Sequence, residues 1–379
     1  MTSGLHHVTL ITRKVQTNVD FYVGLLGLRL VKRTGGYEDA RQLHLFYGDA
    51  QGSPGSLVTF LIWEDGSPGR AGHGQVSEIA FAVAPTAIGF WLERALRFGM
   101  AAEGPQQEFG ETVLRLRDPD GFIVKLVATP LSGEGWTSDG IPPEHRIHRL
   151  RGVTLLSATQ EETVHFLATH AGFARQAREG GVERLRSEAG DCLDIRDAGG
   201  FWPGIPGTGT ADHVAVRAPD AARLSGIERE LSKLNSSATA LHDRQYFISL
   251  YVREPGGTLI EFATDGPGFT VDEPVETLGT QLFVPPDAQG EADDIRVVLP
   301  QFALPGDERV IYRDLPFVHR FHQPADADGS VIVLLHGSGG NETDLMPLAH
   351  RVAPRATLLG LRGRSTEEGT ARWFRRRSE

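Results

Sequence analysis

Cysteine is almost missing from this chain of 379 residues, because Cys192 is the only one. A single cysteine excludes an internal disulfide, and such usage is typical of proteins in a reducing compartment. Long apolar runs are missing as well: the longest, such as residues 331–335, are far shorter than the ~20 residues of a transmembrane helix. The first residues also lack the charged and apolar segments of a signal peptide. We therefore expect a soluble, cytoplasmic protein.

Basic residues are in deficit. The chain has 38 Lys and Arg against 49 Asp and Glu, which gives a formal net charge of −11. Binding to nucleic acid or to an anionic membrane needs a basic face, so the composition disfavours both classes of partner. Hydrophobic residues make up 40% of the chain, an ordinary globular share, and the length suggests two or three domains.

The first two-thirds of the chain repeat one unit four times, over residues 5–63, 75–128, 148–196 and 211–264. Each unit opens with an apolar strand, continues with an amphipathic helix and closes on strands that end after a Gly-containing turn. The closing turns at residues 117–121 (RDPDG) and 253–257 (REPGG) have nearly the same sequence. The pattern predicts an α+β fold of four βαβββ modules within a domain at residues 1–265.

Three strands of these modules carry a polar residue where a core residue is expected. His7 and His213 lie in opening strands, and Glu261 lies in a closing strand. A lone histidine in a strand is more often a core or surface residue, but here three positions agree. Two His and one carboxylate with open coordination positions form the facial triad of non-haem Fe(II) enzymes that use O₂. We expect these three residues to bind one metal ion.

Only module 4 has both a His and a carboxylate at these positions, and module 1 has the His alone. The opening position holds Glu78 in the second module and Gly152 in the third, and the closing positions of the first three modules hold Thr59, Lys125 and Asp194. Neither module 2 nor module 3 makes a credible site. Because ligands lie roughly 2 Å from a metal ion, the first and fourth modules must face each other. We therefore expect two curved sheets, one from modules 1 and 4 and one from modules 2 and 3.

The fourfold module, with ligands on its first and last strands, resembles the vicinal oxygen chelate superfamily of glyoxalases, bleomycin-resistance proteins and extradiol dioxygenases. The division of ligands between modules 1 and 4, and the opening sequence LHHVTL at residues 5–10, resemble the hydroquinone ring-cleaving dioxygenases, including the chlorohydroquinone enzymes. In catechol enzymes the ligands all lie in the second half. The resemblance implies Fe(II), with Mn(II) left open, and an aromatic diol and O₂ as substrates. It also implies a role in aromatic degradation or quinone detoxification, and a homo-oligomer is compatible with it.

The same resemblance points to three further site residues, His6, Arg244 and Tyr251. Arg244 would offset negative charge that develops in the reaction, and Tyr251 or His6 would supply or accept protons. Side chains alternate along a strand, so His6 reaches the face of His7 only if the strand begins or bulges there. We expect ten other histidines to be structural or solvated: His44, His73, His145, His148, His165, His170, His242, His319, His322 and His350.

Two alternatives to ring cleavage stay open. One is a glyoxalase-type metal-dependent isomerase or thiol transferase, which needs no O₂. The other is a non-catalytic aromatic-binding protein of the resistance type. The retained triad argues against the second alternative, because a binder has no need of a metal with vacant positions.

The rest of the chain follows a different pattern. Residues 266–308 are predicted to be a linker or arm, and residues 309–379 an incomplete α/β-hydrolase-like segment. Strands are expected at 317–321, 331–335 (continuously buried) and 356–361, and a helix at 345–352. The turn His336, Gly337, Ser338, Gly339 and Gly340 resembles the oxyanion turn of the carboxylesterase/phospholipase branch of α/β-hydrolases. No Gly-x-Ser-x-Gly nucleophile motif occurs in the sequence, so we expect no esterase activity.

Overall fold

The structure is a computed structural model that describes residues 4–130, 136–233, 240–308, 317–367 and 369–375. The chain divides into two compact units. The first comprises Met1–Arg33 and His44–Gln281, and the second Thr34–Leu43 and Leu282–Glu379. The predicted linker at residues 266–308 is therefore divided between the units at residue 281, and the predicted domain boundaries stay a prediction.

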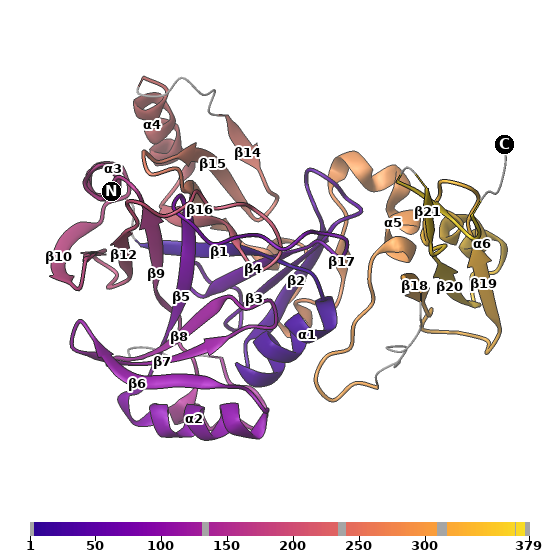
Figure 1. Cartoon of the computed structure of the whole chain (residues 1–379), viewed down its shortest axis with the longest axis horizontal. Helices are drawn as coiled ribbons and strands as arrows, with labels where there is room; N and C mark the ends of the chain where they lie inside the picture. The colour runs from indigo at the N-terminus through magenta and orange to yellow at the C-terminus, as the bar shows by residue number, and fades with distance from the viewer. Residues whose placement is uncertain (1–3, 131–135, 234–239, 309–316, 368, 376–379) are drawn as a thin grey trace. The chain divides into compact units, whose positions relative to one another are not determined.

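Each module of the first unit has one opening strand, a helix and three further strands (Figure 1). Module 1 contains β1 (Leu5–Thr12), α1 (Val15–Val19), the π-helix η1 (Asp20–Leu25), β2 (Arg29–Gly35), β3 (Leu43–Gly48) and β4 (Leu57–Ile62). Module 2 contains β5 (Gln75–Val83), η2 (Pro85–Ala87), α2 (Ile88–Arg97), β6 (Ala102–Glu108), β7 (Glu111–Arg117) and β8 (Ile123–Ala128). Module 3 follows η3 (Pro143–His145) and contains β9 (Leu150–Ser157), α3 (Gln160–His170), β10 (Ala174–Glu179), β11 (Val182–Arg186) and β12 (Cys192–Asp197). Module 4 contains β13 (Ala211–Ala218), α4 (Ala221–Leu231), β14 (Leu241–Asp243), β15 (Phe247–Arg253) and β16 (Leu259–Pro267).

The modules pair into two sheets. The strand order of the first is β14-β15-β16-β13-β1-β4-β3-β2, and that of the second is β10-β11-β12-β9-β5-β8-β7-β6. Antiparallel pairing of β1 with β13 joins modules 1 and 4, and that of β5 with β9 joins modules 2 and 3. Within each module the closing strand runs parallel to the opening strand beside it. The ligand positions of modules 1 and 4 consequently lie at the centre of one sheet. The predicted α+β fold with curved sheets is confirmed.

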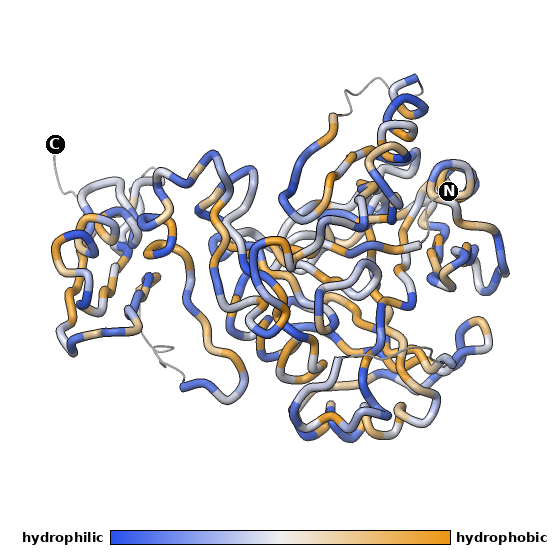
Figure 2. Tube along the Cα trace, turned by 180° about the vertical axis from the view of Figure 1, so that it is seen from behind, coloured by the Kyte–Doolittle hydropathy of each residue, from blue (hydrophilic) through white to orange (hydrophobic). Residues whose placement is uncertain are grey.

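The sequence periodicity explains which faces are buried. Every residue of β1 is buried, and helix α4 buries Leu224, Ile227 and Leu231 at the spacing of one helical face. The Asp220 side chain begins α4 by accepting the N–H of Arg223. Hydrophobic segments follow the strands in the interior of the first unit, as Figure 2 shows. None of the described helices combines the length and the apolar character that a transmembrane span needs.

The two similar closing turns tie neighbouring modules together. Asp118 accepts the backbone N–H of Phe122 and also the Tyr22 hydroxyl, at 3.1 Å, from the helix of module 1. Glu254 accepts the N–H of Thr258 and the Thr163 hydroxyl, at 2.6 Å, from the helix of module 3. In each case a turn carboxylate that shapes its own loop also anchors the helix of the preceding module.

The described part of the second unit holds two α-helices and a three-stranded sheet, in which β20 (Thr357–Leu361) lies between β18 (His319–His322) and β19 (Val331–Leu335). Its core consists of Val297, Val298, Met346, Ala349, Ala356 and Leu358. The elements of this unit and of the preceding segment are η4 (Phe269–Val271), η5 (Val275–Thr277), β17 (Leu282–Phe283), η6 (Pro286–Glu291), α5 (Ala292–Val298), β18 (His319–His322), β19 (Val331–Leu335), α6 (Met346–Val352), β20 (Thr357–Leu361), β21 (Ser365–Glu367) and β22 (Thr370–Arg372). Helix α5 lies in the predicted linker, yet it packs into this core.

The prediction that residues 331–335 are continuously buried is wrong. Ile332 and Leu334 pack against the core, but Val331, Val333 and Leu335 are 62%, 54% and 56% exposed. The reason is that β19 is an edge strand, and the described helices of this unit cover only the face that carries Ile332 and Leu334.

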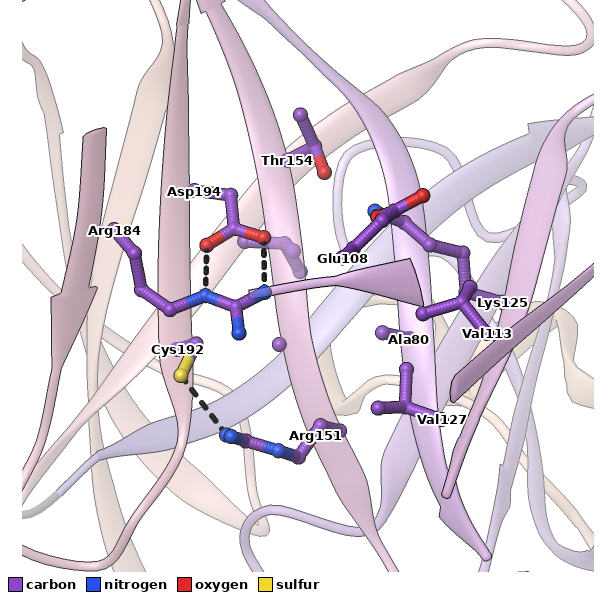
Figure 3. Close-up of a pocket in the computed structure, with 12 residues that line it drawn as sticks. Ala80, Glu108, Val113, Lys125, Val127, Arg151, Thr154, Arg184, Cys192 and Asp194 are labelled. Atoms are coloured by element: carbon purple, nitrogen blue, oxygen red, sulfur yellow. Dashed lines mark hydrogen bonds and ion pairs between the residues drawn. The ribbon is translucent and has the colours of Figure 1, made fainter. Parts of the chain in front are cut away.

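Charged side chains from modules 2 and 3 surround a small pocket in the second sheet (Figure 3). The Arg184 guanidinium donates to both carboxylate oxygens of Asp194, each at 2.7 Å. A third bond, 2.9 Å long, runs from Arg184 to Glu111, which also accepts from Arg151 at 2.8 Å. Because Glu111 belongs to module 2 and the two arginines to module 3, these bonds hold the modules together.

A second group of charged side chains lies within module 2. The Lys125 ammonium lies 2.6 Å from Glu78 and 3.2 Å from Glu108, and Arg115 pairs with both carboxylates. Glu78 and Lys125 are the residues at the ligand positions of this module, so those positions hold an internal ion pair. With Arg115, Lys125, Arg151 and Arg184 set against Glu78, Glu108, Glu111 and Asp194, the network has no net charge.

Breaking this network is expected to destabilise the first unit. Arg184→Met should lower the free energy of unfolding by about 3–5 kcal/mol, because Asp194 stays buried without its partner. Denaturant unfolding followed by circular dichroism measures the change. The double variant Arg184→Met/Asp194→Leu should regain part of the loss. Arg117→Met is the control, since Arg117 and its partner Glu103 are 56% and 60% exposed, and it should lose far less. Equal losses in Arg184→Met and Arg117→Met would contradict the prediction.

Candidate metal centre

His7, His213 and Glu261 meet on one face of the first sheet because of strand register. His7 on β1 and Glu261 on β16 both lie opposite Ala215 of the central strand β13, one on each side. His213 is two residues before Ala215, so its side chain shares that face. Ligand atoms of the three residues lie within 4.8 Å of one another. The strands therefore set three donor atoms around the small methyl group of Ala215.

The three donor atoms converge closely. Oε2 of Glu261 lies 3.1 Å from Nε2 of His7 and 2.8 Å from Nε2 of His213. The two Nε2 atoms are 3.2 Å apart. Glu261 is fully buried, His7 is 2% exposed and His213 is 7% exposed. Such a buried carboxylate between two imidazoles is a strong electrostatic arrangement, since solvent screens it little.

The charges of the site follow from this burial. Burial alone would raise the pKa of Glu261, but the adjacent His7 and His213 hold it well below its usual range, so the carboxylate is ionised. Burial lowers the pKa of His7 more than Glu261 raises it. For His213 burial is outweighed by Glu261 and Asp212, which raise its pKa to about 9. The ionised carboxylate is therefore balanced by a proton on His213, which a bound metal ion would replace.

Hydrogen bonds from outer partners orient His213 and Glu261 toward the common position. Nδ1 of His213 lies 2.7 Å from the Asp212 carboxylate, which fixes the ring and directs Nε2 inward. Oε1 of Glu261 accepts a hydrogen bond from the Ser249 hydroxyl. Oε2 of Glu261 is buried and has no hydrogen-bond partner among the described residues, although both Nε2 atoms face it. A metal site requires donor atoms that outer hydrogen-bond partners hold in position. His7, His213 and Glu261 meet this requirement, so they fit a metal ion.

His6 reaches this face because β1 is irregular there. The pairing of β1 with β13 shifts between Leu5 and His7, which marks a bulge at His6. Nδ1 of His6 lies 2.9 Å from Nδ1 of His7, and its Nε2 lies 3.2 Å from the carbonyl oxygen of Thr264. The Phe247 ring packs on both imidazoles, with centroids 5.0 and 5.4 Å away. Both nitrogens of His6 are thus engaged within the protein.

Tyr251 and Arg244 lie beside the ligands. Tyr251 on β15 is opposite Glu261 on β16, and its ring centroid is 5.5 Å from that of His213. The guanidinium carbon of Arg244 lies 5.6 Å from the Tyr251 ring centroid. Burial, and then the Glu261 charge, raise the pKa of Tyr251, so its hydroxyl is neutral. The site wall formed by module 4 consequently offers one fixed cation and one hydroxyl.

Several neighbours were not identified from the sequence. Thr9 lies 2.9 Å from Nε2 of His213, Thr59 lies 2.8 Å from Thr9, and His44 lies 2.9 Å from Thr59. His44, one of the histidines expected to be structural or solvated, thus ends a chain of contacts that begins at a ligand. One signal was available: Thr59 occupies the closing-strand position that corresponds to Glu261 in module 4.

The glycine-rich turn of the second unit is held by His336. Its Nε2 accepts the N–H of Gly363 at 2.9 Å, and its carbonyl accepts the Trp373 indole N–H at 2.9 Å. Gly337, Ser338 and Gly339 are exposed, and Gly340 donates its N–H to the Gly337 carbonyl. His336 thus fixes the turn, and the absence of esterase activity stays a prediction.

Comparisons with known proteins agree with this architecture. Residues 4–126 match the family described as the Glyoxalase/Bleomycin resistance protein/Dioxygenase superfamily. The protein named "Putative ring-cleaving dioxygenase MhqO" of Bacillus subtilis strain 168 is 36% identical over 288 residues, 75% of this chain and 91% of the relative. The "Chlorohydroquinone/hydroquinone 1,2-dioxygenase" of Sphingobium indicum is 31% identical over 307 residues, 77% of this chain and 94% of the relative.

A crystal structure and a shorter match complete the comparison. The structure of a "putative dioxygenase" from Bacillus subtilis is 34% identical, has a TM-score of 0.77, and the match covers 80% of this chain and 98% of that one. "Putative hydrolase MhqD" of Bacillus subtilis is 52% identical over 50 residues, 13% of this chain and 25% of the relative. The predicted resemblance to a hydrolase start is thereby confirmed for a small part of the chain. The two dioxygenase relatives and the crystal structure cover 75%, 77% and 80% of this chain, at 36%, 31% and 34% identity. The chain therefore belongs to the ring-cleaving dioxygenase family of the glyoxalase/bleomycin-resistance/dioxygenase superfamily.

Proposed function

We propose that this protein is an Fe(II)-dependent, extradiol-type dioxygenase that opens the ring of hydroquinone-like diols, with catecholic diols as further candidates. The observation that carries the proposal is the convergence of His7, His213 and Glu261, two imidazoles and one carboxylate, on a buried position of the first sheet. The relatives named as ring-cleaving dioxygenases support a dioxygenase role. The name of the Sphingobium relative supports the hydroquinone class of substrate.

His7, His213 and Glu261 would hold the metal, Fe(II) by preference and Mn(II) as the alternative. Bound there, the metal would lower the pKa of a ring hydroxyl and supply the redox chemistry that O₂ requires. Arg244 would stabilise negative charge on the ring oxygens, because a guanidinium stays protonated and presents several N–H donors. Tyr251 would donate a hydrogen bond from its neutral hydroxyl to the same oxygens.

His6 has a different part in this proposal. Nε2 of His6 donates to the Thr264 carbonyl, which leaves its Nδ1 as the acceptor of the N–H at Nδ1 of His7. That bond fixes the His7 ring and turns its Nε2 toward Glu261. We assign His6 as a positioning residue for His7, in place of the proton transfer that the resemblance implies.

Oxygen consumption tests the proposed reaction. Fe(II)-loaded protein is mixed without O₂ with hydroquinone, chlorohydroquinone or catechol, and O₂ is then added. We expect about one O₂ to be consumed per ring, and a ring-opened product by mass spectrometry. No uptake with any of these diols would overturn the proposal. Turnover of a glutathione adduct of methylglyoxal without O₂ would instead support the isomerase alternative.

The space beside Ala215 provides a test of the ligand set. Ala215→Val adds two methyl groups where the three donors meet and should weaken metal affinity by roughly 5–150-fold, as 1–3 kcal/mol of misfit implies. Metal titration with equilibrium dialysis measures the change. Ala218→Val is the matched control, because Ala218 is equally buried on β13 but faces the other side of the sheet. Equal effects of both variants would argue against a metal at this position.

Asp212 offers a test of the outer partners. Removing the carboxylate in Asp212→Ala frees the His213 ring and should weaken metal affinity or activity by about 10–100-fold. Asp212→Asn keeps an oxygen acceptor for Nδ1 and should lose less. The same dialysis measurement, with thermal unfolding to verify the fold, distinguishes the variants. Wild-type affinity in Asp212→Ala would show that this contact does not support the ligand.

A further inference from the structure

A chain of polar side chains leads from the ligands to the outer part of module 1. Thr9 on β1 pairs directly with Thr59 on the parallel strand β4, so both hydroxyls lie on one face of the sheet. Thr9 is two residues after His7 and therefore shares its face. On β3, Phe46 lies opposite Thr59, and His44, two residues earlier, shares that face as well. The alternation of three adjacent strands thus aligns Thr9, Thr59 and His44.

The contacts along this line are short enough for hydrogen bonds. They measure 2.9 Å from Nε2 of His213 to the Thr9 hydroxyl, 2.8 Å from Thr9 to Thr59, and 2.9 Å from Thr59 to Nε2 of His44. Both threonines are 1% exposed, whereas His44 is only partly buried and packs on the Phe46 ring at 4.1 Å. The chain therefore begins beside a ligand atom in the interior and ends on an imidazole that is partly accessible to solvent.

We propose that Thr9, Thr59 and His44 form the path by which a proton leaves the metal centre when a diol binds. The inference rests on the proposed function, because an aromatic diol that binds as an anion must give up a hydroxyl proton. The O–H bond of the diol breaks and its proton passes to the Thr9 oxygen. The hydroxyl proton of Thr9 moves to Thr59, that of Thr59 moves to Nε2 of His44, and the imidazolium returns its extra proton to water. The diol monoanion and the one released proton balance the charge.

Other groups at the site are poorly suited to this task. Arg244 cannot accept a proton, and both nitrogens of His6 are engaged by His7 and Thr264. Asp212 is held by His213. Burial, together with His7 and His213, lowers the pKa of His44 to about 3, so its imidazole is neutral and has a lone pair for a proton. The hydroxyls of Thr9 and Thr59 connect the His44 imidazole to the ligand His213.

The experiment follows proton release and diol binding, without O₂ and without turnover. Full-length protein loaded with Fe(II) or Mn(II) is mixed in a stopped-flow instrument with 4-nitrocatechol, whose absorbance reports binding, and a pH indicator in weak buffer reports the proton. We expect His44→Ala to release the proton at least about 100-fold more slowly, the lower end of the effect of a positioned acid–base group. Metal content and the dissociation constant of the diol should stay within twofold of wild type.

Chemical rescue distinguishes the path from a structural role. Added imidazole should restore the rate in His44→Ala, where it can take the place of the missing ring. It should not do so in Thr59→Val, where the path is interrupted inside the protein by a side chain of similar shape. His165→Ala is the control, since His165 is exposed on α3 in module 3, and it should release the proton at the wild-type rate.

Two results would overturn the path. One is a wild-type rate of proton release in His44→Ala, and the other is equal rescue of His44→Ala and Thr59→Val by imidazole. If the wild-type protein binds diol and consumes O₂ in either case, only the path fails. If metal-loaded wild-type protein binds no diol, the proposed function fails and the path with it.

Discussion

A buried carboxylate held between two imidazoles is the interaction on which the first unit depends. Leaving Glu261 ionised and fully buried would cost several kcal/mol without compensating positive charge. Positive charge at this position comes from His213, whose pKa is raised to about 9 by Glu261 and Asp212. The positions of the three residues come from strand register, since His7 and Glu261 flank Ala215 in one row across three strands. A shift of one residue in the pairing of β1 with β13 would turn His7 to the opposite face. The register of β1 with β13 therefore both joins modules 1 and 4 and brings the ligands of the site together.

The two sheets share one strand topology but differ in the charged side chains at their central positions. Both have the same order of opening and closing strands. In the first sheet the central positions hold donors that face one another, and one carboxylate oxygen has no hydrogen-bond partner among the described residues. In the second sheet Lys125 and Arg184 bring the cations from the chain itself, and each binds two carboxylates. In the second sheet, basic side chains balance the charges of the buried carboxylates. In the first sheet, the ionised Glu261 lies where a metal ion could bind.

Some features could be predicted from the sequence because they repeat. The four modules and the alignment of His213 with His7 follow from strand periodicity, and the resemblance adds the ligand positions. The side on which His6 lies could not be predicted, since a bulge depends on pairing with β13 and not on local pattern. His44 was missed because it is three contacts away from a ligand, on a strand whose place in the sheet only the topology reveals. The burial of residues 331–335 was predicted wrongly because an apolar run does not tell whether one or both faces of a strand are covered.

Anomalous diffraction at the iron absorption edge, from crystals of the protein loaded with Fe(II) without O₂, would locate the bound metal. The proposed ligand set predicts one strong anomalous peak per chain, within roughly 2.0–2.2 Å of Nε2 of His7, Nε2 of His213 and a carboxylate oxygen of Glu261. A peak that lies elsewhere, or iron bound by only one of these residues, would contradict it.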